Sequence, residues 1–253
     1  MADTQTVIVT GAGSGIGAAT ARRFSADGWN VTLNGRTRAK LDAVARDLPE
    51  ERTLIVEGDV SKAADAKVLV ANTVARFGRL DTLVNNAGIA SMGSPGGLAL
   101  EDFEKMMSVN VTGIFNTVTA AIDPLKATEG SIVNVSSVSG IGGDWLLFGY
   151  NASKGAVSNM TRAMALDLGR KNVRVNAVAP SLTRTDMTDG VMSNPALLQK
   201  FRERIPMQRA AEPEEVASVI AFLAGPDARF VNGVVLPVDG GLSASNGQPD
   251  FTQ

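Results

Sequence analysis

The stretch "VIVTGAGSGIG" (residues 7–17) joins a short β-branched run to a glycine-rich turn and then to the start of a helical pattern. This order predicts a strand, a turn and a helix whose backbone amides can receive a pyrophosphate group. The six-residue pattern G-x-G-x-x-G does not fit from Gly11, because its sixth position is Ile16. The spacing present is Gly11-x-x-x-Gly15-x-Gly17. A merely flexible turn is the alternative interpretation.

Outward from this turn, short β-rich runs alternate with segments that have apolar residues at three- and four-residue spacing. Strands are expected at 6–10, 30–35, 53–59, 82–88, 131–137, 172–180 and 233–241, and helices at 15–28, 38–48, 66–78, 100–122, 151–171 and 213–225. Strands that are apolar nearly throughout, each followed by a helix, predict a parallel sheet covered on both faces. The fold class is therefore α/β.

The expected architecture is one doubly wound, Rossmann-like domain over residues 1–253, with a seven-stranded parallel sheet. Residues 182–209 interrupt the alternation of strands and helices. They are long and contain methionine and proline, so we expect them to form a mobile substrate lid.

The composition excludes several classes of function. Hydrophobic residues make up 44% of the chain, charged residues 20%, and the net charge is −2. No basic excess suggests nucleic acid, and no apolar run suggests a membrane span. The chain has no histidine and no cysteine. A Ser-His-Asp triad and the usual zinc ligand sets are thereby excluded, no metal site is expected, and a reducing cytoplasm is the expected compartment.

The only tyrosine of the chain, Tyr150, lies four residues before Lys154 in "GYNASK" (149–154). On a helix this spacing places both side chains on one face. A nearby ammonium group is expected to lower the pKa of the phenol from its usual value of about 10, although burial opposes this effect. The pair would then supply acid–base chemistry without imidazole. A solvated helix face is the alternative.

Three motifs together carry a resemblance to a known family: the glycine turn, "NNAG" (85–88) and Tyr150-x-x-x-Lys154. In this order, over essentially the whole chain, they resemble the short-chain dehydrogenase/reductase family. The resemblance implies a nicotinamide cofactor, hydride transfer and a homotetramer or homodimer. It also implies a catalytic tetrad of Asn110, Ser137, Tyr150 and Lys154.

The first two members of the tetrad each have an alternative. Ser137 lies thirteen residues before Tyr150, at the family's spacing, and its hydroxyl would polarise a substrate carbonyl. Its neighbour Ser136 competes for this role, but strand alternation places the two side chains on opposite faces. Asn110 falls inside a predicted helix, where the resemblance suggests that it holds a water linking Lys154 to solvent. It could instead be a packing amide.

The end of the second strand bears on the choice of cofactor. NAD-binding proteins place an acid there, whereas this chain has Gly35 followed by Arg36. A guanidinium group suits the 2′-phosphate of NADP, so NADP(H) is expected in preference to NAD(H). Ser14 weakens the inference, because many NADP-dependent relatives carry a basic residue there. Arg36 as a solvated turn residue is the alternative.

Further cofactor contacts follow from the resemblance. Asp59 resembles an adenine-contacting residue, but it could simply terminate the third strand. Beside the nicotinamide, Ser181 replaces a glycine that is usual in the family. The full set of expected cofactor residues is Gly11, Ser14, Gly15, Ile16, Gly17, Arg36, Asp59, Val60, Asn86, Ala87, Gly88, Tyr150, Lys154, Pro180, Thr183 and Thr185.

Within the family, "SGIGGDW" (139–145), "APSLTRTDMT" (179–188) and "PVDGGLSASNGQP" (237–249) resemble 2,3-butanediol, acetoin and diacetyl dehydrogenases. The expected substrate is a small or medium ketone or secondary alcohol, contacted by Ser139, Trp145 and, from a neighbouring subunit, Gln248. The alternative for Gln248 is a disordered tail. A 3-oxoacyl-[acyl-carrier-protein] reductase is the alternative enzyme, and an NADP-binding scaffold or redox sensor is the non-enzyme alternative.

Overall fold

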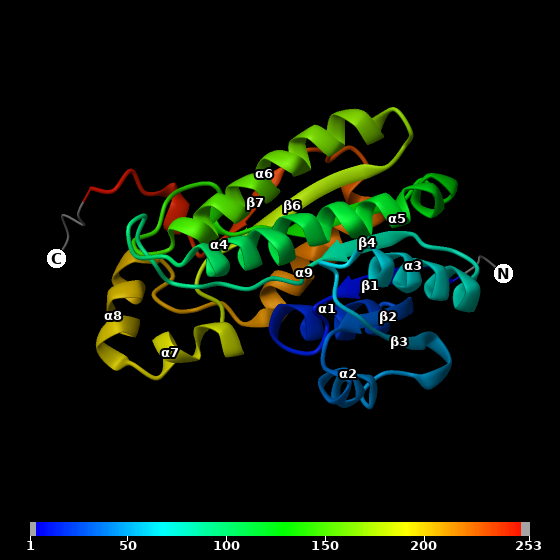
Figure 1. Cartoon of the computed structure of the whole chain (residues 1–253), viewed down its shortest axis with the longest axis horizontal. Helices are drawn as coiled ribbons and strands as arrows, with labels where there is room; N and C mark the ends of the chain where they lie inside the picture. Colours follow the sequence, from blue (N-terminus) through cyan, green and yellow to red (C-terminus); the bar gives the residue numbers. More distant parts are fainter. Residues whose placement is uncertain (1–3, 249–253) are drawn as a thin grey trace.

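The computed structural model describes residues 4–248, and its centre is one parallel sheet of seven strands (Figure 1). The strands are β1 (Thr6–Thr10), β2 (Asn30–Gly35), β3 (Thr53–Glu57), β4 (Thr82–Asn85), β5 (Ser131–Val135), β6 (Arg174–Pro180) and β7 (Val235–Val238). The helices are α1 (Gly15–Ala26), α2 (Arg38–Ala45), α3 (Ala63–Phe77), α4 (Leu100–Met107), α5 (Gly113–Ala127), α6 (Phe148–Gly169), α7 (Asp189–Met192), α8 (Pro195–Arg204) and α9 (Pro213–Ala224). The predicted fold class is confirmed.

The strand order is β3-β2-β1-β4-β5-β6-β7. The chain therefore builds outward from β1 to β3, returns to pair β4 with the other side of β1, and continues to β7. The connections leave β1 and β4 in opposite directions, which opens a crevice at their carboxyl ends. Ligands of doubly wound sheets bind in such a crevice.

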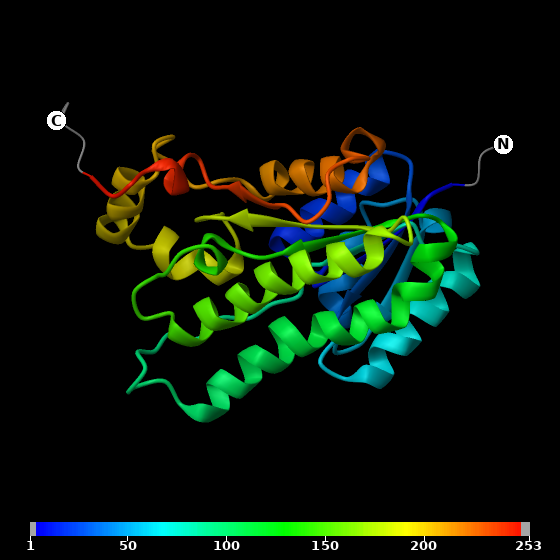
Figure 2. The ribbon, with the colours of Figure 1, turned by 90° about the horizontal axis from the view of Figure 1, so that it is seen from above.

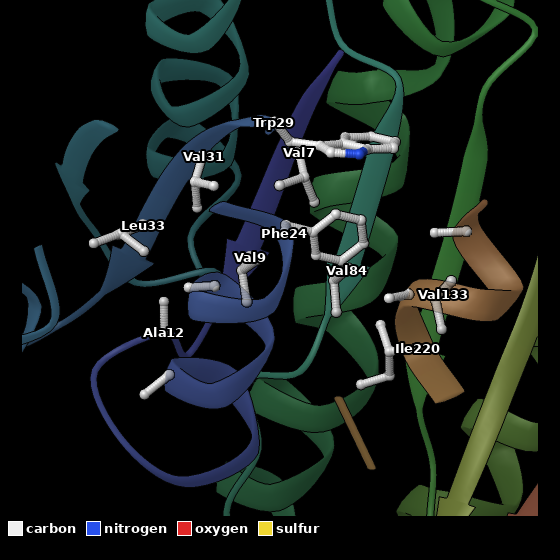
Figure 3. Packing of buried hydrophobic residues seen from close by; sticks show 14 of the residues in the cluster. Val7, Val9, Ala12, Phe24, Trp29, Val31, Leu33, Val84, Val133 and Ile220 are labelled. Atoms are coloured by element: carbon white, nitrogen blue, oxygen red, sulfur yellow. The ribbon is translucent and has the colours of Figure 1, made fainter. Parts of the chain in front are cut away.

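Two apolar cores hold helices against the two faces of the sheet (Figure 2). Alternate residues of β1 show the division, since Val7 and Val9 face the core under α1, α2 and α9, while Ile8 faces the core under α3, α5 and α6. Figure 3 shows the first core, where the Phe24 and Trp29 rings meet edge to face with centroids 5.0 Å apart. Both faces are thus sealed, and the carboxyl edge of the sheet carries the polar loops.

Element boundaries differ from the sequence expectation by a few residues. Four strands end earlier than predicted, at Glu57, Asn85, Val135 and Val238. The polar motifs that follow these strands therefore belong to loops at the carboxyl edge. The helix predicted at 151–171 begins at Phe148 and so includes Tyr150 in its first turn, and the helix predicted at 66–78 begins at Ala63.

The helix predicted at 100–122 extends to Ala127 and is interrupted by a π-helical segment, Ser108–Thr112. This wider turn inserts one extra residue between α4 and α5 and carries Asn110. Residues 182–209 contain a short helical turn, α7 and α8, which lie beyond the carboxyl ends of β6 and β7 (Figure 2). No helix among residues 4–248 is long and apolar enough to cross a bilayer.

Candidate active site

The glycine turn fits a phosphate group because side chains are excluded from it. Gly11 and Gly15 adopt φ angles of 65° and 52°, which glycine tolerates and other residues rarely adopt. A Cβ atom on Gly17 would lie 2.2 Å from the Gly11 carbonyl oxygen. Ser14 is the N-cap of α1, but its side chain makes no capping hydrogen bond. The first-turn amides of α1, including that of Ile16, therefore face the crevice as anion donors.

The end of β4 is fastened to the same turn. The Thr10 hydroxyl accepts hydrogen bonds from the Asn86 and Ala87 amides at 3.0 and 3.1 Å, and the Asn86 side chain donates to the Thr10 and Gly11 carbonyls. A Cβ atom on Gly88 would lie 3.4 Å from Lys154 Nζ. The Asn86–Gly88 segment thus connects the glycine turn to Lys154. Sequence analysis missed Thr10 as the residue that makes this connection.

The end of β2 carries exposed positive charge. Arg36 follows Gly35, the last residue of the strand, and its side chain is exposed. Burial raises the pKa of Asp59. Hydrogen bonds from Ser61 and the charges of Arg36 and Lys62 together lower this pKa by more, so the net pKa lies below the usual value. Asp59 lies two residues beyond the end of β3, so it does not terminate that strand.

A lysine that sequence analysis missed lies beside Ser14. Lys40, in the first turn of α2, packs against Gly13, where a Cβ atom would lie 2.9 Å from Lys40 Cβ. Lys40 Nζ donates to the Asp186 carboxylate at 3.0 Å, and the same carboxylate bonds to Ser14. An ion pair therefore ties the first residues of the lid to α2, next to the glycine turn. In the sequence, Lys40 is marked only as the third basic residue of "GRTRAK" (35–40).

The residues after β6 close over the glycine turn. Thr185 packs on Gly15, where a Cβ atom would lie 2.8 Å from Thr185 Cγ2. Thr185 and Thr188 cap each other's backbone groups, and the Thr188 hydroxyl donates to the Thr183 carbonyl at 2.6 Å. Pro180 ends β6, and its carbonyl lies 3.5 Å from Ser137 Oγ. The expected nicotinamide-side residues therefore line one continuous segment beside the crevice.

Ser137 and Tyr150 come together at the carboxyl edge of β5. The Ser137 hydroxyl lies beside the Tyr150 phenol and lowers its pKa, and Ser137 Oγ accepts a hydrogen bond from the Ser139 amide at 3.1 Å. Ser136 turns the other way, because its hydroxyl bonds to the Lys154 carbonyl and to Ser158 Oγ at 3.1 and 2.7 Å. This arrangement supports Ser137, rather than Ser136, as the group beside the phenol.

Lys154 is buried, and its ammonium group donates to the Val135 carbonyl at 2.7 Å. Nζ lies 5.7 Å from the centre of the Tyr150 ring. Burial lowers the pKa of Lys154 from 10.5 to about 8. The lysine thus lies below the phenol on one helix face, as the spacing predicted.

The direction of the Tyr150 shift corrects the sequence expectation. Burial raises the pKa of the phenol, a hydrogen bond from Ser137 lowers it, and the charge of Asp144 raises it again, so the net pKa lies above 10. Desolvation therefore outweighs the effect of Ser137. A lowered pKa would require the positive charge of an oxidised nicotinamide beside the phenol.

The Asn110 side chain forms its hydrogen bonds with other residues of the protein. Its Oδ1 accepts from the Ile89 amide at 2.9 Å, and its Nδ2 donates to the Ile89 carbonyl at 2.9 Å and to Ser153 Oγ at 3.0 Å. It is a buried amide that holds the loop after β4 against α6. The water-holding role that the resemblance suggests stays a prediction. Val60 packs against Gly113, because a Cβ atom on Gly113 would lie 2.8 Å from Val60 Cγ2.

The three expected substrate residues lie in different surroundings. Ser139 is buried beside Ser137, whereas the side chain of Trp145 is 93% exposed. Gln248 is exposed, and its recorded bond joins its own amide to Asn246 Oδ1 at 3.1 Å. Within residues 182–209, Met192 packs with Leu182 and Ile205. Sequence analysis also missed the hydrogen bond between Ser139 and Asp144.

Comparisons with known proteins find similarity over nearly the whole chain. A family model described as enoyl-(acyl carrier protein) reductase matches residues 11–243. The meso-2,3-butanediol dehydrogenase of Serratia marcescens is 47% identical over 247 residues, covering 98% of each chain.

Two solved structures share the fold. One is a 3-ketoacyl-(acyl-carrier-protein) reductase from Brucella melitensis complexed with NADH, with a TM-score of 0.88, 35% identity and coverage of 94% of this chain and 98% of that chain. The other is a gluconate 5-dehydrogenase from Burkholderia cenocepacia in complex with NADP and tartrate, with a TM-score of 0.91, 31% identity and 96% coverage of each chain. The protein described here belongs to the short-chain dehydrogenase/reductase family, and is an oxidoreductase acting on CH–OH groups.

Proposed function

We propose that the protein transfers a hydride between NADP(H) and a small ketone or secondary alcohol of the acetoin, diacetyl or butanediol type. The observation that carries this proposal is the position of Lys154, between the Tyr150 ring and the Asn86–Gly88 segment that is bonded to the glycine turn. The similarity to a meso-2,3-butanediol dehydrogenase over the whole chain supports the substrate class.

The chemistry follows from the positions of these groups. A nicotinamide cofactor supplies the hydride donor or acceptor when it is bound. Ser137 is placed to donate a hydrogen bond to the substrate oxygen, and Tyr150 to give that oxygen a proton during reduction or take one during oxidation. Lys154 keeps a positive charge below the phenol and favours its deprotonated form.

The preference for NADP(H) rests on two cations. Arg36 occupies the end of β2 without an acidic residue at Gly35. Position 14 holds a serine rather than a basic residue, but Lys40 of α2 brings a positive charge beside Ser14. Both side chains are exposed, so a 2′-phosphate can reach them without moving the core.

A turnover screen tests the proposal. We expect diacetyl and acetoin to be reduced with NADPH faster than with NADH, and acetoacetyl thioesters to be poor substrates. Fast turnover of acetoacetyl-acyl carrier protein would instead favour a 3-oxoacyl-[acyl-carrier-protein] reductase. That alternative is supported by the exposed Arg202 and Arg204 of α8, which are suited to an acidic carrier protein.

We also propose a homotetramer in which α4–α5 and α6 pair across a two-fold axis. Phe115 on α5 is 61% exposed and Leu166 on α6 is 78% exposed. Large apolar side chains at such exposure indicate a contact surface. Light scattering should show a tetramer that Leu166→Glu dissociates. A stable monomer of the unmodified protein at micromolar concentration would overturn this assembly.

A further inference from the structure

A carboxylate lies one hydroxyl group away from Ser137, the serine proposed to hold the substrate oxygen. Ser137 Oγ and Ser139 Oγ are 3.1 Å apart, and Ser139 Oγ donates a hydrogen bond to the Asp144 carboxylate. Ser137 and Ser139 are buried, whereas Asp144 is exposed. The carboxylate therefore lies at the open side of the proposed catalytic site, two hydrogen-bond lengths from Ser137.

The charge of Asp144 also acts on the phenol. It raises the pKa of Tyr150, as a nearby negative charge does. No recorded ion pair among residues 4–248 includes Asp144. Within the described chain, the site thus holds a carboxylate close to the proposed reacting groups and without a cationic partner.

This carboxylate can only accept further hydrogen bonds. An ionised carboxylate has about four lone-pair sites and no proton to donate. The hydrogen bond from Ser139 occupies one of these sites. A ligand group that approaches the other sites is stabilised if it carries a proton, and it is repelled if it is a carbonyl or a carboxylate.

The segment that carries Asp144 is held in place by other contacts. The Asn151 side chain donates to the Asp144 carbonyl at 3.0 Å, and the Gly93 amide donates to the Leu146 carbonyl at 2.7 Å. Leu146 adopts a φ of 60°, which is rare for a residue other than glycine. An acceptor fixed in this way can discriminate between ligand groups, whereas a mobile one would turn away from a mismatched group.

A substrate whose oxygen accepts from Ser137 brings its next carbon toward Asp144. Two heteroatoms on adjacent carbons lie about one hydrogen-bond length apart when they are gauche. Two hydrogen-bond lengths also separate Ser137 Oγ from the carboxylate. The second heteroatom of such a substrate is therefore within reach of Asp144 while the first stays on Ser137.

We propose that Asp144 selects substrates that carry a proton donor, a hydroxyl or an ammonium group, on the carbon next to the reacting carbon. Acyloins, vicinal diols and vicinal amino alcohols belong to this class, whereas 1,2-diketones and 2-oxo acids present an acceptor at the same place. Ser139 is a positioning residue, because it acts through its hydrogen bond to Asp144. This role of Asp144 rests on the proposed function and narrows it, since acetoin and butanediol fit the site better than diacetyl.

Three ketones with one carbon skeleton test this selection. Acetoin, diacetyl and 2-butanone differ only at C3, which bears a hydroxyl group, is a carbonyl or is a plain methylene. In Asp144→Asn, the new amide can donate to the second carbonyl of diacetyl. We expect the ratio of kcat/KM for acetoin to kcat/KM for diacetyl to fall by at least about tenfold. This is less than the roughly 10⁴–10⁵-fold of fully buried sites, because Asp144 is exposed.

The ratio separates selection from a general loss of activity. A change that only disturbs the fold or the phenol lowers kcat/KM for all three ketones alike, so an unchanged ratio in Asp144→Asn overturns the role of Asp144. Ser139→Ala keeps the carboxylate but releases it, and should lower the ratio by a smaller factor. A larger fall in Ser139→Ala would place the selection at Ser139 and overturn the proposal. Asp123→Asn removes an exposed carboxylate on α5 and should leave the ratio and the turnover unchanged.

Alcohol oxidation distinguishes the two kinds of proton donor. The matched alcohols are 2-butanol, 2,3-butanediol and 3-amino-2-butanol. In Asp144→Asn, kcat/KM should fall most for the amino alcohol, because hydrogen bonds between ionised groups are stronger than those of neutral groups, and least for 2-butanol. A fall confined to the diol supports the selection with a hydroxyl group as the partner. Equal losses for all three alcohols overturn it.

Binding measurements separate the role of Asp144 from the proposed function. Tyr150→Phe removes the proposed acid–base hydroxyl, so the binding of ketones to this variant and its reduced cofactor can be followed by the fluorescence of that cofactor. Acetoin should bind more tightly than diacetyl, and adding Asp144→Asn should remove this preference. If the unmodified enzyme turns over none of these compounds, the proposed function fails, but the binding order still tests Asp144. A binding order that is the same with and without Asp144 overturns the selection.

Discussion

The two ends of the proposed cofactor crevice are built in different ways. At the catalytic end, Ser137 and Lys154 are buried and hydrogen-bonded to fixed neighbours. At the adenosine end, Arg36 is exposed, and Lys40 and Asp186 form an ion pair in which their side chains are 56% and 67% exposed. Function at the catalytic end therefore depends on individual buried atoms in fixed positions. Binding at the adenosine end depends on exposed charges, whose effect salt and substitutions can change.

The largest effect should come from Tyr150→Phe. This change keeps the ring and removes only the hydroxyl, so kcat should fall by roughly 10²–10⁴-fold while cofactor affinity survives. Steady-state kinetics and calorimetric cofactor titration measure the two quantities. Normal turnover by the variant would show that the proton comes from another group.

Ser136→Ala and Ser137→Ala form a matched pair for the same site. Both remove one buried hydroxyl, but only Ser137 lies beside the phenol. We expect Ser137→Ala to lower kcat by about 10²-fold, as for a lost oxyanion donor, and Ser136→Ala to change mainly the melting temperature. Equal losses of kcat would contradict the assignment.

Lys154→Met should inactivate the enzyme and yet stabilise the fold. A pKa lowered by burial from 10.5 to about 8 corresponds to a cost of roughly 3 kcal/mol while the lysine is charged. Lys154→Met removes this cost but also loses the hydrogen bond to the Val135 carbonyl. The free energy of unfolding at pH 7 should therefore rise by about 2 kcal/mol. The unmodified protein binds fewer protons than its unfolded chain between pH 8 and 10.5, so its stability rises there.

Denaturant melts of both proteins across this pH range test the sign. The advantage of Lys154→Met should be greatest below pH 8 and shrink toward pH 10.5. If the stability advantage of Lys154→Met instead grows with pH, burial does not disfavour the charged form of Lys154.

At the adenosine end, Gly35→Asp combined with Arg36→Ser adds an acid and removes a cation. The ratio of kcat/KM with NADPH to that with NADH should fall by about 10-fold or more, because the 2′-phosphate then meets repulsion instead of attraction. If the unmodified enzyme already uses both cofactors equally, Arg36 does not select the phosphate.

The smallest effects concern the ion pair of Lys40 and Asp186. Lys40→Gln should weaken binding of 2′,5′-ADP by a few-fold, and Asp186→Asn should strengthen it by a similar factor, because Asp186 competes for the same ammonium group. Binding of 5′-AMP, which lacks the 2′-phosphate, should change little. Asp189→Asn is the matched control on the lid. Equal responses of both nucleotides would mean that Lys40 does not meet the phosphate.

Much of the fold and the motifs followed from the sequence, because buried parallel strands and glycine turns leave clear local signals. The seven strands were predicted within three residues of their bounds. The pairing of Tyr150 with Lys154 followed from helix periodicity. These features depend on neighbours in the chain.

The features that sequence analysis missed depend on distant contacts. Lys40 and Asp186 are 146 residues apart, and nothing local marks them as partners. The raised pKa of Tyr150 was missed because burial competes with a nearby charge, and a sequence shows the charge but not the burial. Asp144 reads as an exposed loop residue until the folded chain brings it against Ser139.

The π-helical segment at Ser108–Thr112 has a consequence for how the length of the chain can change. Its extra residue lets Asn110 reach Ile89 and Ser153 while α4 and α5 keep their own packing faces. Deleting one residue here would restore a regular helix and remove the wide turn that brings Asn110 to Ile89 and Ser153. Evolution can therefore lengthen the loops at either end of this helix far more easily than it can remove a codon from its middle.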